Sequence, residues 1–139
     1  MKSFAASLDA FANKTVAQME AVMKESVGDV LDIIQTPKSA GGRMPVLDGN
    51  LINSVASGLN GSFSGGGGGP DKSGAASAAQ IELTIAGMEI GDVARFAWTA
   101  NYAMHQELGT SKMRGNHFVG AAAAEWPQIV ERNAARVKS

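Results

Sequence analysis

The sequence predicts an α+β fold in which a long N-terminal helix and a C-terminal helix pack on a small antiparallel β-sheet. Apolar residues recur every three or four positions over 4–35 and again over 118–137, whereas apolar and polar residues alternate over 80–88. A long Gly- and Ser-rich stretch at 60–79 lies between these regions. The 139 residues fit one domain, which we place at 1–139.

The first helix is predicted over 4–35, with an apolar stripe at helical spacing on one face. Pro37 ends it, because the residue before a proline is disfavoured in the helical conformation. One unbroken helix of this length measures about 45–50 Å, more than the domain needs to cover its own core, so one end is expected to pack on something else. The alternative is a kink near Gly28, since glycine weakens helix interiors. The stripe consists of Phe4, Leu8, Phe11, Thr15, Met19, Val22, Ser26 or Val27, Val30 and Ile34.

The middle of the sequence is predicted to be rich in loops. Residues 37–50 should form a loop, and 51–59 a short helical turn that leads into a strand. The stretch 60–79 buries too little apolar surface to offset the entropy lost on ordering, so we expect a flexible loop there. Shortening 64–78 should then leave stability nearly unchanged. The glycine run lacks the Gly-Lys-Ser ending and the following helix of a phosphate-binding loop, so no nucleotide site is expected.

Two strands are predicted after this loop, at 80–88 and 93–101, joined by a tight connection into a hairpin. Ile81, Leu83 and Ile85 alternate with polar residues, which makes the first of the two the clearest strand in the sequence.

The last part of the chain is predicted to be mostly helical. Residues 102–108 should form a turn or a helical turn closed by a glycine, and 110–116 a polar and basic loop. A final helix is predicted over 118–137, with Asn116 as its N-cap. Pro127 lies inside this pattern and should either kink the helix or start a second one.

Composition narrows the classes of function. Twelve Lys and Arg against thirteen Asp and Glu give a net charge of -1, so no basic excess attracts nucleic acid or anionic lipid. The sequence has no cysteine, no signal-peptide pattern and no apolar run that could cross a bilayer, so we expect a cytoplasmic protein without membrane contact. Catalytic motifs are missing, and His105 and His117 are too few for a metal site. We therefore expect no enzyme activity, no metal and no cofactor.

Three pieces of the sequence carry a resemblance to a known family. They are MPVLDGNLINS at 44–54, NYAMHQELGT at 101–110 and HFVGAA at 117–122. In this order and at this spacing they resemble the neck, or tail-component, proteins of long-tailed bacteriophages. Members of that family show a pattern like Pro-Val-Asp-Thr-Gly-x-Leu-x-x-Ser and later Tyr-Ala-x-x-x-Glu-x-Gly-Thr. The second pattern is matched fully, whereas the first is altered around Asp48.

The resemblance implies a structural virion protein at the head–tail junction, where the subunits form a ring, often a hexamer, around the DNA channel. Its implied partners are other copies of itself, a head-closure or connector protein, and the tail tube or tail terminator protein, with transient contact to translocating DNA. Such a protein is assembled into the virion in the bacterial host cytoplasm. One alternative is a tail terminator ring that caps the tail tube. Another is a small regulatory or toxin-type binding module.

The motifs select a set of candidate residues. Asp48 can cap the turn that follows it, and Gly49 can adopt a positive φ angle there. Glu107 either bonds backbone donors around Gly109 and Thr110, which would fix the loop, or reaches a neighbouring subunit. The candidates for an interface or for fixing a loop are Asp48, Gly49, Tyr102, His105, Glu107, Leu108, Gly109 and Thr110, and those for contact with the lumen or a partner are Lys112 and Arg114.

The segment from Tyr102 to Thr110 is also expected to expose apolar side chains. Tyr102, Met104 and Leu108 would be partly wet in a free monomer, and exposed apolar patches rimmed by charge often mark contact surfaces. A closed ring needs two different patches on each subunit, and the first helix is the candidate for the second patch.

Overall fold

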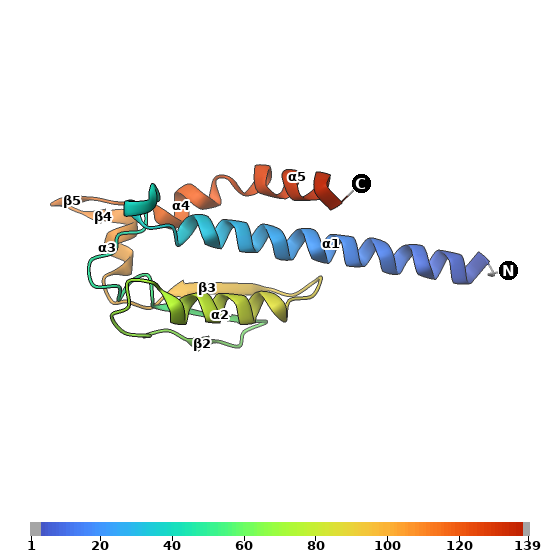
Figure 1. The fold of residues 1–139 in the computed structure, drawn as a ribbon, viewed down its shortest axis with the longest axis horizontal. Helices are drawn as coiled ribbons and strands as arrows, with labels where there is room; N and C mark the ends of the chain where they lie inside the picture. The colour runs from blue at the N-terminus through green and yellow to red at the C-terminus, as the bar shows by residue number, and fades with distance from the viewer. Residues whose placement is uncertain (1–3, 138–139) are drawn as a thin grey trace.

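The structure is a computed structural model that describes residues 4–137, with side chains placed from Thr15 onward. It confirms the α+β class, since helices pack with a small antiparallel sheet that lies on one side of α1 (Figure 1). In chain order the elements are α1 (Phe4–Ile34), the 3₁₀ helix η1 (Lys38–Ala40), β1 (Val55–Leu59), β2 (Ser64–Gly65), α2 (Ala75–Ala86), β3 (Ala94–Trp98), α3 (Ala103–Leu108), β4 (Gly109–Thr110), β5 (Met113–Arg114), α4 (Phe118–Ala123) and α5 (Trp126–Val137).

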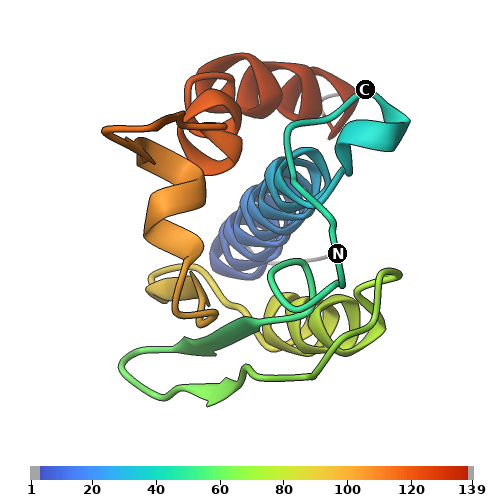
Figure 2. The ribbon, with the colours of Figure 1, turned by 90° about the vertical axis from the view of Figure 1, so that its left-hand side faces the viewer.

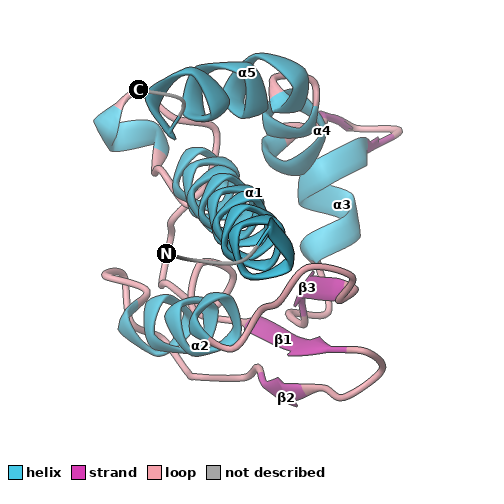
Figure 3. Ribbon diagram, turned by 90° about the vertical axis from the view of Figure 1, so that its right-hand side faces the viewer, coloured by secondary structure: helices cyan, strands magenta, loops and turns pink. Residues whose placement is uncertain are grey.

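Helix α1 is the axis of the molecule. It runs from Phe4 to Ile34 without a break at Gly28, so the prediction of one long helix is confirmed. Helices α4 and α5 cover one side of it, and α2 with the sheet covers the opposite side (Figures 2 and 3). The N-terminal part of α1 extends well beyond the other elements (Figure 1).

The sheet has the order β2-β1-β3, and both pairings are antiparallel. Strand β1 lies in the centre, with Val55 opposite Trp98 and Leu59 opposite Ala94. The predicted strand at 93–101 is therefore present as β3, but the predicted hairpin is wrong, because β3 pairs with β1 instead of with 80–88.

The prediction of a strand at 80–88 is wrong because these residues belong to helix α2 and the turn after it. Ser77, Ile81 and Thr84 are buried at helical spacing, whereas Leu83 is 69% exposed. The alternation of Ile81, Leu83 and Ile85 suggests a strand, but the alanine-rich residues before it have high helix propensity.

The stretch 60–79 is not the single loop that was predicted, since it contains β2 and the first residues of α2. The buried side chain of Asn53 holds its second half in place. The Asn53 Oδ1 accepts hydrogen bonds from the N–H groups of Ala76 (3.0 Å) and Ser77 (3.2 Å), and Nδ2 donates to the carbonyl oxygen of Gly69 (3.2 Å). Asn53 thereby supplies acceptors to the first turn of α2, where backbone N–H groups lack helical partners.

Hydroxyl and amide groups also join α2 to β1. The Oγ of Ser57 and the Oγ1 of Thr84 are 2.6 Å apart and share a hydrogen bond. The Nε2 of Gln80 donates to the Oγ of Ser57 at 3.1 Å and to the Oγ of Ser64 at 3.2 Å. Ser57 and Thr84 are buried, so these bonds satisfy polar groups that water does not reach.

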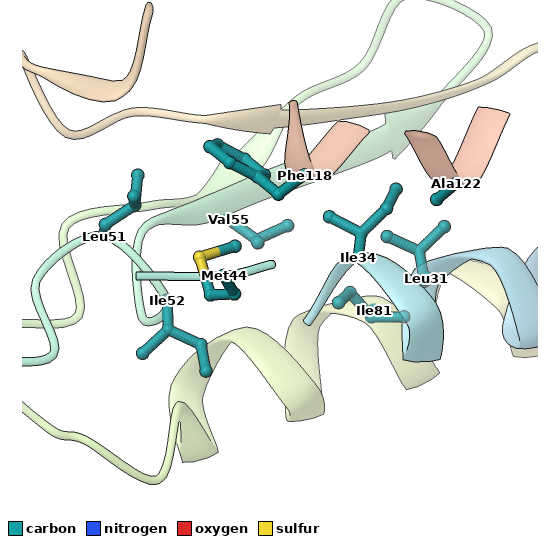
Figure 4. Close-up of a cluster of buried hydrophobic side chains, with 9 residues drawn as sticks. All are labelled: Leu31, Ile34, Met44, Leu51, Ile52, Val55, Ile81, Phe118 and Ala122. Atoms are coloured by element: carbon teal, nitrogen blue, oxygen red, sulfur yellow. The ribbon is translucent and has the colours of Figure 1, made fainter. Parts of the chain in front are cut away.

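The apolar core lies where the C-terminal end of α1 meets β1, α2 and α4 (Figure 4). The ring of Phe118 meets that of Trp98 edge to face, with centroids 5.8 Å apart. The indole N–H of Trp98 donates to the side chain of Gln35 at 2.9 Å. The buried cluster consists of Leu31, Ile34, Met44, Leu51, Ile52, Val55, Ile81, Phe118 and Ala122.

Two further predictions about local structure are confirmed. A turn at 51–53 leads into β1, and residues 103–108 form the short helix α3. The predicted loops at 37–50 and 110–116 contain η1 and the β4–β5 hairpin, respectively.

The predicted C-terminal helix is divided into α4 and α5. Pro127 is the second residue of α5, so it starts a second helix, where its missing N–H costs little. Asn116 is not the N-cap of α4. His117, with φ 51°, occupies that position, and the Asn116 side chain instead donates to Gln106.

We expect Asn53→Ala to lower the free energy of unfolding by about 2–3 kcal/mol, since the N–H groups of Ala76 and Ser77 lose their side-chain acceptor and the Gly69 carbonyl loses one of its two donors. Urea denaturation followed by circular dichroism measures this loss. Asn101→Ala is the matched control, because Asn101 is exposed and should change stability by less than about 0.5 kcal/mol. Equal effects of the two substitutions would show that 64–78 is a free loop after all.

Three aspartates close loops, and hydrogen bonds hold the pKa of each carboxyl below its usual value. The main donors are the backbone N–H of Asn50 to Asp48, the hydroxyl of Ser73 to Asp71 and the side chain of Asn60 to Asp92. Asp32 differs, because burial raises its pKa and the nearby carboxylates of Asp29 and Glu25 add to that effect.

A carboxyl whose pKa is lower in the folded state stabilises the fold above its unfolded pKa and loses that contribution as the pH falls through the folded pKa. We therefore expect the loop aspartates to make the protein less stable below about pH 4. Urea midpoints at pH 6 and pH 3 measure the change. The variant with Asp48, Asp71 and Asp92 all changed to Asn should lose less stability over this range, and an identical loss would exclude these turns as the cause.

A candidate protein–protein interface

The motif at Tyr102–Thr110 folds into α3 and the start of the β4–β5 hairpin, next to the N-terminus of α4 (Figure 1). The carboxylate of Glu107 accepts the N–H of Val119 at 3.0 Å through Oε1 and the N–H of Gly120 at 2.8 Å through Oε2. These are charge-assisted bonds to unpaired donors at a helix N-terminus. Glu107 thus fixes the chain internally, but it bonds α4 and not the predicted donors around Gly109 and Thr110.

Backbone bonds reinforce this junction. The N–H of His117 donates to the carbonyl of Glu107 at 3.0 Å, and the N–H of Asn116 donates to that of Gln106 at 2.8 Å. Gly109 has φ +88°, and a Cβ there would lie 2.5 Å from the backbone nitrogen of Gly115. Only glycine fits so close an approach, which explains Gly109 in the motif.

The Asp48–Gly49 turn forms as expected from the sequence. Asp48 accepts the backbone N–H of Asn50 at 2.9 Å and its side-chain amide at 2.8 Å. Gly49 has φ +93°, and its Cα faces the backbone of Asp71 so closely that a Cβ would lie 2.3 Å from the carbonyl carbon.

The structure brings this turn and Tyr102 together, although they are more than fifty residues apart. They line an open pocket of about 280 Å³ with Leu51 and Gln106. Burial raises the pKa of the Tyr102 phenol, and the Asp48 carboxylate adds to the effect. Tyr102 is half-buried against the core and therefore lies at its edge, as predicted.

The apolar side chains of α3 face outward. Met104 is 71% exposed and Leu108, one turn later on the same helix, is 63% exposed. Met113 on β5 is 40% exposed and lies between two exposed cations, Lys112 and Arg114. We call these five residues the α3 corner. His105 is exposed nearby, and Thr110 pairs with Met113 across the hairpin.

A second apolar surface lies between α1, the helix expected to carry the second patch, and α5, which sequence reasoning did not implicate. It is an open groove of about 730 Å³ lined mainly by apolar side chains, and Glu131 is the one ionisable residue among the described residues that line it. We call it the α1–α5 groove. The helical pattern of 126–137 could have indicated an apolar face, but not which part of it remains open. Its principal apolar residues are Met19, Val22, Met23, Ile90, Trp126 and Val130.

Other kinds of site are not evident among the described residues. Within 4–137, and for side chains from Thr15 onward, no three His, Cys, Asp or Glu residues come close enough to share a metal ion. No helix in that range has the length and apolarity needed to cross a membrane. Comparisons with protein-family models, curated proteins and solved structures give no match to this chain.

We expect Glu107→Ala to destabilise the protein by about 1–2 kcal/mol, because two N–H groups at the start of α4 lose a charged acceptor. Glu107→Gln keeps one acceptor oxygen and should cost less. Thermal and urea denaturation measure both effects, with Glu82→Ala on the exposed face of α2 as the control. If Glu107→Ala leaves stability unchanged but alters self-association, the carboxylate acts between subunits instead.

Proposed function

We propose that this chain is a structural protein of a long-tailed bacteriophage and forms a ring at the head–tail junction. The observation that carries the proposal is the arrangement of the motif Tyr102–Thr110. The one acidic residue of that motif, Glu107, is used inside the subunit to hold α4, while Met104 and Leu108 are left facing solvent. The motif holds α3 rigidly against α4 and exposes apolar side chains on α3, and exposed apolar side chains on a rigid element suit binding to another protein.

A ring of identical subunits requires a contact between two different surfaces, repeated by rotation until the ring closes. The α3 corner and the α1–α5 groove are two such apolar surfaces on one chain. The remaining proposed partners are the head-closure or connector protein and the tail tube or tail terminator protein, which would meet the two faces of the ring.

Contact with DNA is proposed to be weak and transient. The net charge of the chain is -1, so a channel lined by these subunits would not hold DNA tightly. Lys112 and Arg114 on the β4–β5 hairpin are exposed cations that could touch phosphates or the neighbouring ring.

Leu108→Asp tests this function in the virus. The variant should fold, because Leu108 is exposed, but self-association should weaken by about thirtyfold or more, as for an interface hot spot. Phage particles that carry the change should be tailless and non-infectious by electron microscopy and plaque assay, while circular dichroism of the purified chain stays normal.

Leu83→Asp is the matched control, since Leu83 is 69% exposed on α2. It should leave particles tailed. Absence of the chain from purified virions would contradict the proposed function, whereas normal tails and titre with Leu108→Asp would contradict only the role of the α3 corner.

A further inference from the structure

The α1–α5 groove is part of a longer apolar surface along α1. A second open groove of about 430 Å³ continues it past Val30, with Phe96 and Trp98 of β3 among its lining residues. Trp126 lines both grooves and is 38% exposed. From Thr15 to Ile34 the rise of α1 gives a length of about 28 Å. A surface this long and apolar is unusual on a subunit that remains alone.

The one ionisable residue among the described residues that line the groove is acidic, although Arg136 lies between the lining residues Ala135 and Val137, and Lys24 directly follows Met23. Glu131 lines it, Glu125 directly precedes Trp126, and Glu89 directly precedes Ile90. All three carboxylates belong to exposed residues.

The α3 corner has the complementary character. Met104, Leu108 and Met113 are exposed apolar groups, and Lys112 and Arg114 flank Met113. The β4–β5 hairpin projects from one end of the molecule, whereas α5 and the α2–β3 turn that carries Ile90 lie toward the other (Figure 1). The corner of one chain therefore cannot enter its own groove.

Building on the proposed function, we propose that the α1–α5 groove of one subunit receives the α3 corner of a second copy. Met104 and Leu108 then cover Trp126, a contact that suits the polarisable methionine sulfur and the indole ring. Lys112 or Arg114 faces Glu131, so opposite charges lie at the edge of an apolar contact. Because the two surfaces differ, the contact is heterologous and repeats from copy to copy.

The sharpest test uses two variants, one with the α3 corner blocked and one with the α1–α5 groove blocked. Leu108→Asp blocks the corner, and Ala134→Lys places a long cation in the groove from an exposed position on α5. Each variant alone should be monomeric in sedimentation velocity at concentrations where the wild type assembles. Mixed in equal amounts they should form a dimer and nothing larger, since one intact corner meets one intact groove.

Two matched variants control for the substitutions themselves. Leu83→Asp and Ala79→Lys make the same changes at exposed positions of α2 and should assemble like the wild type. Circular dichroism shows whether each variant is folded, and a variant that is not can be replaced by Met104→Asp or Ala135→Lys at the same surface.

Exchanging the charges of the two surfaces tests whether Lys112 or Arg114 pairs with Glu131. Glu131→Lys should weaken wild-type assembly about tenfold, and so should Lys112→Glu with Arg114→Glu. Combining all three changes in one chain should restore most of the affinity, and the restored contact should weaken as salt rises.

The inference is overturned if the two blocked variants stay monomeric when mixed, if either still assembles alone, or if the wild type never assembles. If Ala134→Lys prevents assembly but Leu108→Asp does not, another segment or another protein occupies the groove. These results are separate from the proposed function, which depends on the presence of the chain at the head–tail junction and on tail attachment.

Discussion

The fold depends on covering one end of α1 from both sides at once. Leu31 and Ile34 near the C-terminus of α1 lie between Ile81 of α2 and the residues Phe118 and Ala122 of α4. Neither α2 nor α4 is long enough to be stable alone, so each depends on this shared apolar cluster. The middle of α1 has α5 beside it, where Asn133 donates to Ser26 and Asp29, and the N-terminal part of α1 extends beyond the other elements (Figure 1). The uneven cover explains why the apolar grooves lie along α1.

The elements that sequence predicts correctly are those decided by neighbouring residues. Helix α1 follows from a long repeated stripe, and the break before α5 follows from Pro127. Helix α2 was mistaken for a strand because its burial depends on partners far along the chain. Ser77 and Thr84 are buried only because Val55 and Ser57 offer hydrogen-bond partners. No local pattern shows that a serine faces such a partner, so the sequence suggested a flexible loop instead.

In the candidate interface, too, some features could be predicted from neighbouring residues and others depend on distant ones. The conformations of Gly49 and Gly109 could be expected, since a glycine in a turn adopts positive φ at little cost. The acceptor role of Glu107 could be expected as well, but its donors lie twelve and thirteen residues away on α4. The exposure of Trp126 could not be expected, because it arises only from the way α5 crosses α1.

Helix α4 is a short rigid connection between the two apolar surfaces. Glu107 binds its first turn to the α3 corner, and three residues after its last residue comes Trp126 of the groove. Its six residues span about 9 Å and are anchored in the core by Phe118. If adjoining copies meet as proposed, α4 fixes the relative orientation of the two surfaces and thereby the rotation angle between neighbouring subunits. The number of subunits in a closed circle is then encoded within a single chain, in the length and placement of one short helix.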